Sequence, residues 1–163
     1  MALECSLGVL PEEPESLPTS GEMASPGFPS NYHNDIHERK TIEVAKGNVI
    51  NIHFTDFNLE NPDQVDYLEI TDGDGTLLGH FGAGYYVDEG QRWDLDGGLR
   101  KEISDLTSVT ETVHVLFHTD ESVTSTGWRL EWSKLRLFII DKSDQSYVEV
   151  LLRRWEGSSQ QVV

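Results

Sequence analysis

Short stretches in which apolar and polar residues alternate run through the middle of the chain. The clearest is 49–54, where every second residue is apolar, the period of a half-buried β-strand. The same period returns in 113–117 and in 128–132, and a weaker form occupies 41–44. Between residues 21 and 132 no run has convincing helical periodicity. The pattern therefore predicts many short strands and no helix in this region.

A hairpin is predicted around the sequence Asp72-Gly73-Asp74-Gly75. Apolar alternation precedes it in 66–70 and follows it in 76–81, and a cluster of Asp and Gly between two such runs is typical of a tight turn. The cluster also resembles the start of a helix–loop–helix calcium loop. The twelfth position of that loop would be Ala83 instead of the required glutamate, which favours the turn.

Strands at this spacing, separated by turn residues, indicate an all-β, antiparallel two-sheet β-sandwich. We expect a flexible acidic lead-in at 1–20, one sandwich domain at 21–133 and a C-terminal extension of uncertain structure at 134–163. Within the extension, 147–155 fits a strand or an amphipathic helix, and 156–163 is expected to be disordered. The length of 163 residues suits one domain.

The charge of the chain is strongly negative. Twelve Lys and Arg stand against 29 Asp and Glu, a formal net charge of −17. Such a field repels nucleic acid and anionic membranes and attracts cations or a basic protein surface. No apolar run is long enough for a transmembrane segment, and Met1–Pro11 makes no clear signal peptide. Cys5 is the one cysteine, so no disulfide can form within the chain.

Catalytic motifs are missing from the sequence. It contains no Gly-x-Ser-x-Gly nucleophile motif and no glycine-rich phosphate loop. Cys5 lies in the lead-in, where nothing is expected to lower the pKa of its thiol. We therefore expect that the chain is not an enzyme by itself.

The six histidines are the other candidates for metal ligands. His114 and His118 share one face of a strand but are four residues apart, about 13 Å, which is too far for one ion. His53 could approach one of them across a sheet. We interpret these histidines as solvent-facing strand residues.

Four motifs in order, spread over residues 20–133, resemble those of the CUB domain family. Residues 24–32 resemble its opening "SPNYPxxYP", and 49–60 resemble "IxLxFxxFxLE". Residues 65–73 look like "YDxLxIxDG", and 113–128 look like "LxIxFxSDxSxxxxGF". The resemblance implies a two-sheet jelly-roll sandwich, a secreted or extracellular setting and a binding role. CUB modules occur in complement and developmental proteases, receptors and matrix proteins.

The chain departs from the family pattern where CUB domains usually carry cysteines. Glu38 stands at the place of a first-disulfide cysteine, and Asp63 and Gly82 stand near the places of the second pair. Lys40 replaces a common tryptophan. A missing disulfide removes about 2–5 kcal/mol from a small secreted domain, so the core and any bound metal would have to compensate.

The resemblance also implies a calcium site. The positions that match the family's ligands are Glu60, Asp66, Asp120 and Ser122, and Tyr32 matches a tyrosine that supports a liganding carboxylate or a partner. Calcium needs six to eight oxygen ligands, and three carboxylates from three strand ends would repel one another without a cation. The interval from Glu60 to Asp66 is shorter than in several calcium-binding relatives.

The sequence favours an extracellular, calcium-dependent protein-interaction module that binds a basic, lysine-presenting surface. Its acidity would steer such a partner. Two alternatives stay open. One is an acidic extracellular-matrix or biomineral-associated structural protein, and the other is the regulatory fragment of a larger CUB-containing protease. The sequence does not name the partner or the oligomeric state.

Overall fold

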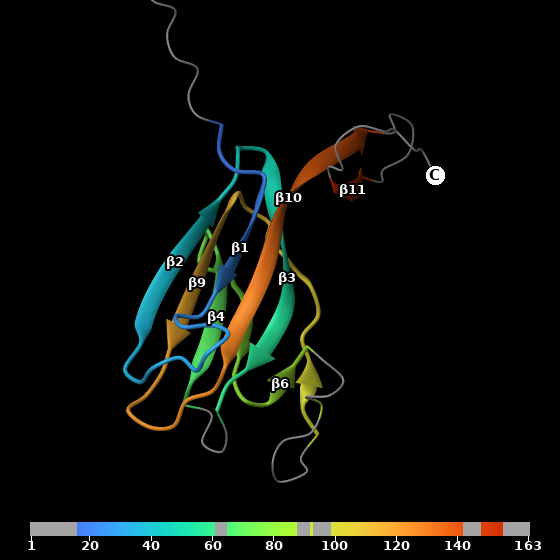
Figure 1. Cartoon of the computed structure of the whole chain (residues 1–163). Coiled ribbons are helices and arrows are strands. Elements are labelled where there is room, and N and C mark those ends of the chain that lie inside the picture. Colours follow the sequence, from blue (N-terminus) through green and yellow to red (C-terminus); the bar gives the residue numbers. More distant parts are fainter. Residues whose placement is uncertain (1–15, 61–64, 88–91, 93–98, 142–147, 155–163) are drawn as a thin grey trace, which may run out of the picture.

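Two antiparallel sheets packed face to face form the body of the protein (Figure 1). The structure is a computed structural model and describes residues 16–60, 65–87, 92, 99–141 and 148–154. No helix among these residues is long and apolar enough to cross a membrane. The expected all-β, antiparallel two-sheet sandwich is confirmed.

The first sheet has the order β1-β10-β3-β8, and β11 pairs with the C-terminal part of β10. Its strands are β1 (Ser20–Ala24), β3 (Asn48–Asn58), β8 (Leu106–Thr107), β10 (Gly127–Asp141) and β11 (Val148–Arg154). Strand β10 is its longest element and pairs with β3 on one side and with β1 on the other.

The second sheet has the order β2-β9-β4-β5. Its strands are β2 (His37–Glu43), β4 (Tyr67–Asp72), β5 (Leu77–Phe81) and β9 (Thr112–His118). The short strands β6 (Tyr85–Tyr86) and β7 (Lys101–Glu102) form a separate parallel pair.

The core lies between the two sheets and follows the alternation seen in the sequence. In β9, buried and half-buried residues alternate from one end to the other, because successive side chains of a strand point to opposite faces. The largest fully buried side chains are those of Trp128, Tyr32, Phe57 and Phe117. The aromatic ring of Phe117 packs edge-on against Trp128 and Tyr32, so both sheets contribute to one core.

Some elements differ from the sequence-based expectations. Strand β1 was not predicted, because the sequence of Ser20–Ala24 shows no alternation of apolar residues. In the C-terminal extension, β10 continues to Asp141, and β11 shows that the strand alternative holds for Val148–Arg154. Most of the predicted lead-in (1–15) and the segment 156–163 lie outside the described residues.

The Asp-Gly turn is a hairpin turn, as predicted. The Asp72 amide donates to the Thr76 carbonyl over 2.8 Å, and Gly75 has a positive φ of 89°. The carboxylate of Asp72, which is fully buried, accepts hydrogen bonds from the amides of Gly73, Val109 and Thr110 and from the Thr110 hydroxyl. Asp72 therefore fastens the loop before β9 to the end of β4.

A polar pair occupies part of the region where relatives would carry cysteine and tryptophan. Lys40 Nζ lies 3.4 Å from Glu38 Oε1, and both side chains remain more than a third exposed. An ion pair this open contributes at most about 1 kcal/mol, so it does not replace a disulfide.

Candidate metal centre

Three carboxylates meet at one end of the sandwich. Strands β3 and β9 finish at this end, the lower end in Figure 1. Glu60 follows β3, Asp66 immediately precedes β4 and Asp120 follows β9. Strand β4 is antiparallel to β9 and begins where β9 ends. Strand β10 is antiparallel to β3 and begins where β3 ends. The topology thus brings three residues from three separate segments together.

The spacing of the three carboxylates suits a single cation. One oxygen from each of Glu60, Asp66 and Asp120 can be chosen so that all three lie within 4.8 Å of one another. Oxygens bound to the same calcium ion lie about 2.3–2.6 Å from it, so two of them are at most about 5 Å apart. The all-oxygen donor set is the one that hard cations such as calcium prefer.

Asp66 is the innermost of the three. Its side chain is fully buried, and each of its two oxygens accepts one hydrogen bond. The Tyr32 hydroxyl donates to Oδ2 over 2.6 Å, and the Asp120 amide donates to Oδ1 over 2.9 Å. These two donors fix the carboxylate plane, and each carboxylate oxygen keeps a lone pair for a cation.

Tyr32 connects this site to the core. Its ring is buried and lies 5.3 Å from the ring of Phe117, and its hydroxyl also accepts the Glu60 amide over 3.1 Å. Burial raises the pKa of the Tyr32 phenol well above its usual value, and the hydrogen bond to the Asp66 carboxylate raises it further. The phenol therefore stays neutral and keeps donating its proton to Asp66.

Ser122 lies beside Asp120 in the loop between β9 and β10. Its amide donates to Asp120 Oδ1 over 2.8 Å, and its hydroxyl lies 3.2 Å from the same oxygen. The structure thus brings all five residues named from the sequence to one end of the fold. Ser122 therefore orients the Asp120 carboxylate.

The sequence analysis missed the loop before β2, which completes this end of the molecule. The Asp35 amide donates to the Asp120 carbonyl over 2.7 Å, and Asn34 Nδ2 donates to the Glu121 carbonyl over 2.7 Å. The side-chain oxygen of Asn34 is buried and has no hydrogen-bond partner among the described residues. A buried acceptor without a donor is unusual in a folded protein. No family motif names Asn34, so the sequence carried no signal for it.

The charge of the two aspartates is not balanced by a basic side chain of the described part of the chain. Within the described residues, neither Asp66 nor Asp120 forms an ion pair with a lysine or an arginine. Like charges held this close in a buried position repel each other strongly, and a divalent cation would remove that repulsion. The residues present therefore fit a calcium ion.

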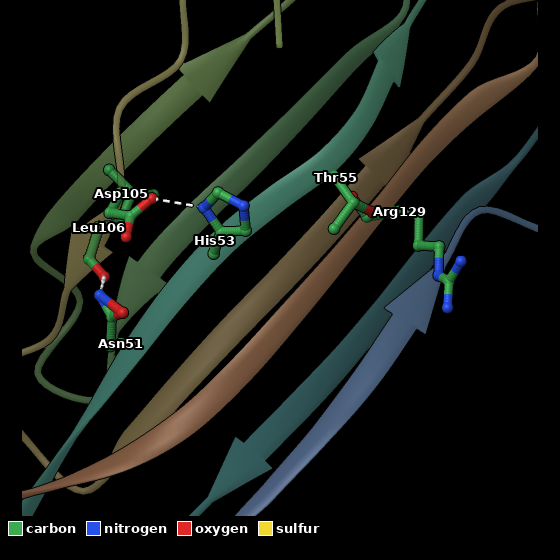
Figure 2. Close-up of polar contacts among 6 residues, drawn as sticks. All are labelled: Asn51, His53, Thr55, Asp105, Leu106 and Arg129. Carbon is green, nitrogen blue, oxygen red and sulfur yellow. Dashed lines mark hydrogen bonds and ion pairs between the residues drawn. The ribbon is translucent and has the colours of Figure 1, made fainter. Parts of the chain in front are cut away.

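His53 does not approach the histidines of β9, the alternative that the sequence left open. His53 lies on β3 in the first sheet, whereas His114 and His118 lie on β9 in the second. Figure 2 shows the surroundings of His53, whose Nδ1 lies 2.7 Å from Asp105 Oδ1. Nearby, the side-chain Nδ2 of Asn51 donates to the Leu106 carbonyl over 3.1 Å (Figure 2). These contacts hold the segment around β8 against β3.

Comparison with known proteins places the chain in a family. The family model for the CUB domain matches residues 14–132. Human mannan-binding lectin serine protease 1 is 29% identical over 118 residues, which are 69% of this chain and 14% of that protein. Pig cubilin is 47% identical over 55 residues, which are 31% of this chain and 2% of that protein. The chain thus spans only a small part of these relatives.

A solved structure of similar fold is titled the MASP-1 CUB2 domain bound to Ca²⁺. It matches with a TM-score of 0.52 at 21% identity, and the match covers 72% of this chain and 95% of that one. At this identity the likeness shows the shared fold. The family match, the order of the motifs and the two-sheet sandwich agree with one another, and the chain belongs to the CUB domain family.

Proposed function

We propose that this chain is a calcium-dependent protein-binding module of an extracellular protein. The observation that carries the proposal is the convergence of Glu60, Asp66 and Asp120 oxygens within 4.8 Å at one end of a CUB fold. Ser122 supplies a further oxygen, and Tyr32 holds Asp66 in place. The similar CUB2 domain whose title names a bound Ca²⁺ supports the choice of ion.

Calcium would act on the loops that form this end of the sandwich. The ligands come from the loops after β3 and β9 and from the residue before β4. An ion bound by all three would link segments that no disulfide links in this chain. It would thereby give the end of the module a fixed shape for a partner, within the proposed domain of residues 21–133.

The partner we propose is a protein that presents a lysine to this end. The net charge of −17 attracts a basic surface, and the half-buried Asp120 and the exposed Asp35 and Glu121 keep negative charge on the outside of the site. A lysine ammonium could then bind the same carboxylates that hold the ion. The extracellular setting is part of the proposal and is supported by the family resemblance.

Calorimetric titration with calcium chloride tests the ion. We expect one site per chain in the wild type, a loss of affinity in Glu60→Gln, and no change in the control Glu43→Gln, an exposed carboxylate on β2. Many weak ions instead of one would contradict the proposal and favour the matrix or mineral alternative.

Binding to lysine-containing peptides tests the partner. Peptides with free lysines should bind only when calcium is present, and the same peptides with acetylated lysines should not bind, because acetylation removes the charge. Equal binding with and without calcium would show that the site plays no part in recognition. Calcium binding without any lysine preference would leave the ion site intact and exclude the proposed partner chemistry.

A further inference from the structure

A pair of histidines lies on the outer face of the second sheet, close to the metal centre but separate from it. His37 begins β2, and His118 ends β9, and the two are direct partners in the antiparallel register. Their Nδ1 atoms are 3.4 Å apart, and their rings are nearly perpendicular, with centroids 5.6 Å apart. Neither the CUB motifs nor the proposed calcium site uses either histidine.

The distance between the two nitrogens fits a shared zinc ion and is long for a hydrogen bond. Hydrogen bonds to nitrogen donors usually span about 2.9–3.0 Å. Two nitrogens bound tetrahedrally to zinc at about 2.0–2.1 Å lie about 3.3–3.4 Å apart. Two nitrogens at right angles around a square-planar ion at the same bond length would be only about 2.8–3.0 Å apart. The observed 3.4 Å matches the spacing of a tetrahedral pair, and in the metal-free protein it allows a long hydrogen bond in which one ring donates to the other.

The surroundings favour a cation and hold one of the rings. The ring of Tyr67 lies 5.0 Å from that of His118 and 4.7 Å from that of His80, so it packs between the two. Two loop residues add negative charge at this edge: Asp35, two positions before His37, and Asp120, two positions after His118. His37 is exposed, so an ion can reach the pair from solvent.

We propose that His37 and His118 form a zinc site with two protein ligands and two positions open to water. Neutral imidazole is a preferred zinc ligand, whereas calcium prefers oxygen, so this site and the carboxylate site select different ions. Among the described residues no third His, Cys, Asp or Glu completes a compact ligand group with the pair. The site is therefore an open one.

The test uses zinc chloride added to the full chain in the presence of saturating calcium. Calorimetry should show one zinc ion per chain, and nitrogen-detected NMR of the imidazoles should show His37 and His118 shifting together. Both His37→Gln and His118→Gln remove a direct zinc ligand. Zinc affinity should fall about 10-fold or more, because the loss of a residue that only supports a metal ligand already lowers metal affinity about 10-fold.

His114→Gln serves as the matched control. His114 lies on the same strand and face and contacts the Thr41 hydroxyl at 3.0 Å, so its loss should leave zinc affinity unchanged. Zinc binding that survives in both His37→Gln and His118→Gln would overturn the proposal. Binding that disappears only in Asp120→Asn would place zinc among the carboxylates and would overturn it as well. No zinc binding in the wild type would show that the pair is only a contact between two rings.

Discussion

At the scale of single residues, two buried polar side chains hold the ends of this sandwich. Tyr32 spans from the aromatic core to the carboxylate of Asp66 at one end, and Asp72 fastens the loop before β9 at the other. Both are fully satisfied by hydrogen bonds from separate segments. A buried polar group stabilises a fold only while its partners are in place. The contribution of each side chain to stability can therefore be tested by removing one atom of Tyr32 or the charge of Asp72.

Tyr32→Phe should destabilise the protein by about 1–3 kcal/mol, because it leaves the Asp66 oxygen and the Glu60 amide without their partner. It should also weaken calcium binding about 10–100-fold, as the loss of a supporting hydrogen bond does in other metal sites. Urea unfolding and calcium titration measure the two effects. The control is Tyr67→Phe, whose hydroxyl makes no described hydrogen bond. Equal effects of both substitutions would contradict the role given to Tyr32.

Asp72 should make stability depend on pH in the acid range. Burial would raise its pKa, but the hydrogen bonds from Thr110, Val109 and Gly73 outweigh that effect and lower it below the usual value. A lowered pKa in the folded state contributes stability that is present above about pH 4 and is lost as the pH falls through the folded value.

Asp72→Asn should therefore cost about 1.5–3 kcal/mol at neutral pH, and the difference from wild type should shrink below about pH 4. Urea unfolding of both proteins across the acid range measures it. A difference that stays constant to the lowest pH, or that grows as the pH falls, would refute this account of Asp72.

At the scale of elements, the strands that alternate most clearly could be predicted from sequence. The alternation in β3 and β9 is clear because each strand buries one face fully and leaves most of the other only half-buried. Strand β1 shows no such pattern, and only its pairing with β10 makes it a strand. The pairing of His37 with His118 also depends on sheet register, which no stretch of either strand specifies alone.

Gly127→Ala should destabilise the start of β10. Gly127 has a φ of 87°, and an added Cβ would collide with the Ser25 side chain, which accepts the Trp128 amide. We expect a loss of about 2–4 kcal/mol in urea unfolding. Gly84→Ala is the control, because a Cβ there meets nothing within 4 Å and Gly84 has no positive φ. A loss of the same size in both variants would show that the collision does not matter.

At the scale of the whole molecule, a chain with a net charge of −17 and a single cysteine forms a two-sheet sandwich. The family motifs made Glu60, Asp66 and Asp120 predictable as a group, since each motif marks a strand end. The hydrogen bond from Asn34 to the Glu121 carbonyl was not predictable, because it depends on how the loop before β2 packs against the loop after β9. A bound cation would reduce the repulsion at this end and stabilise the whole fold.

Thermal unfolding with calcium and with a chelator tests this account most directly. Binding to the folded state at a calcium concentration 100 times the Kd should add about 2.7 kcal/mol, a rise in Tm of roughly 10 °C for a domain of this size. We expect this rise in the wild type and in Glu43→Gln, and none in Asp120→Ala at the same concentration. An equal Tm with calcium and with the chelator in the wild type, or an equal rise in Asp120→Ala, would contradict the calcium site.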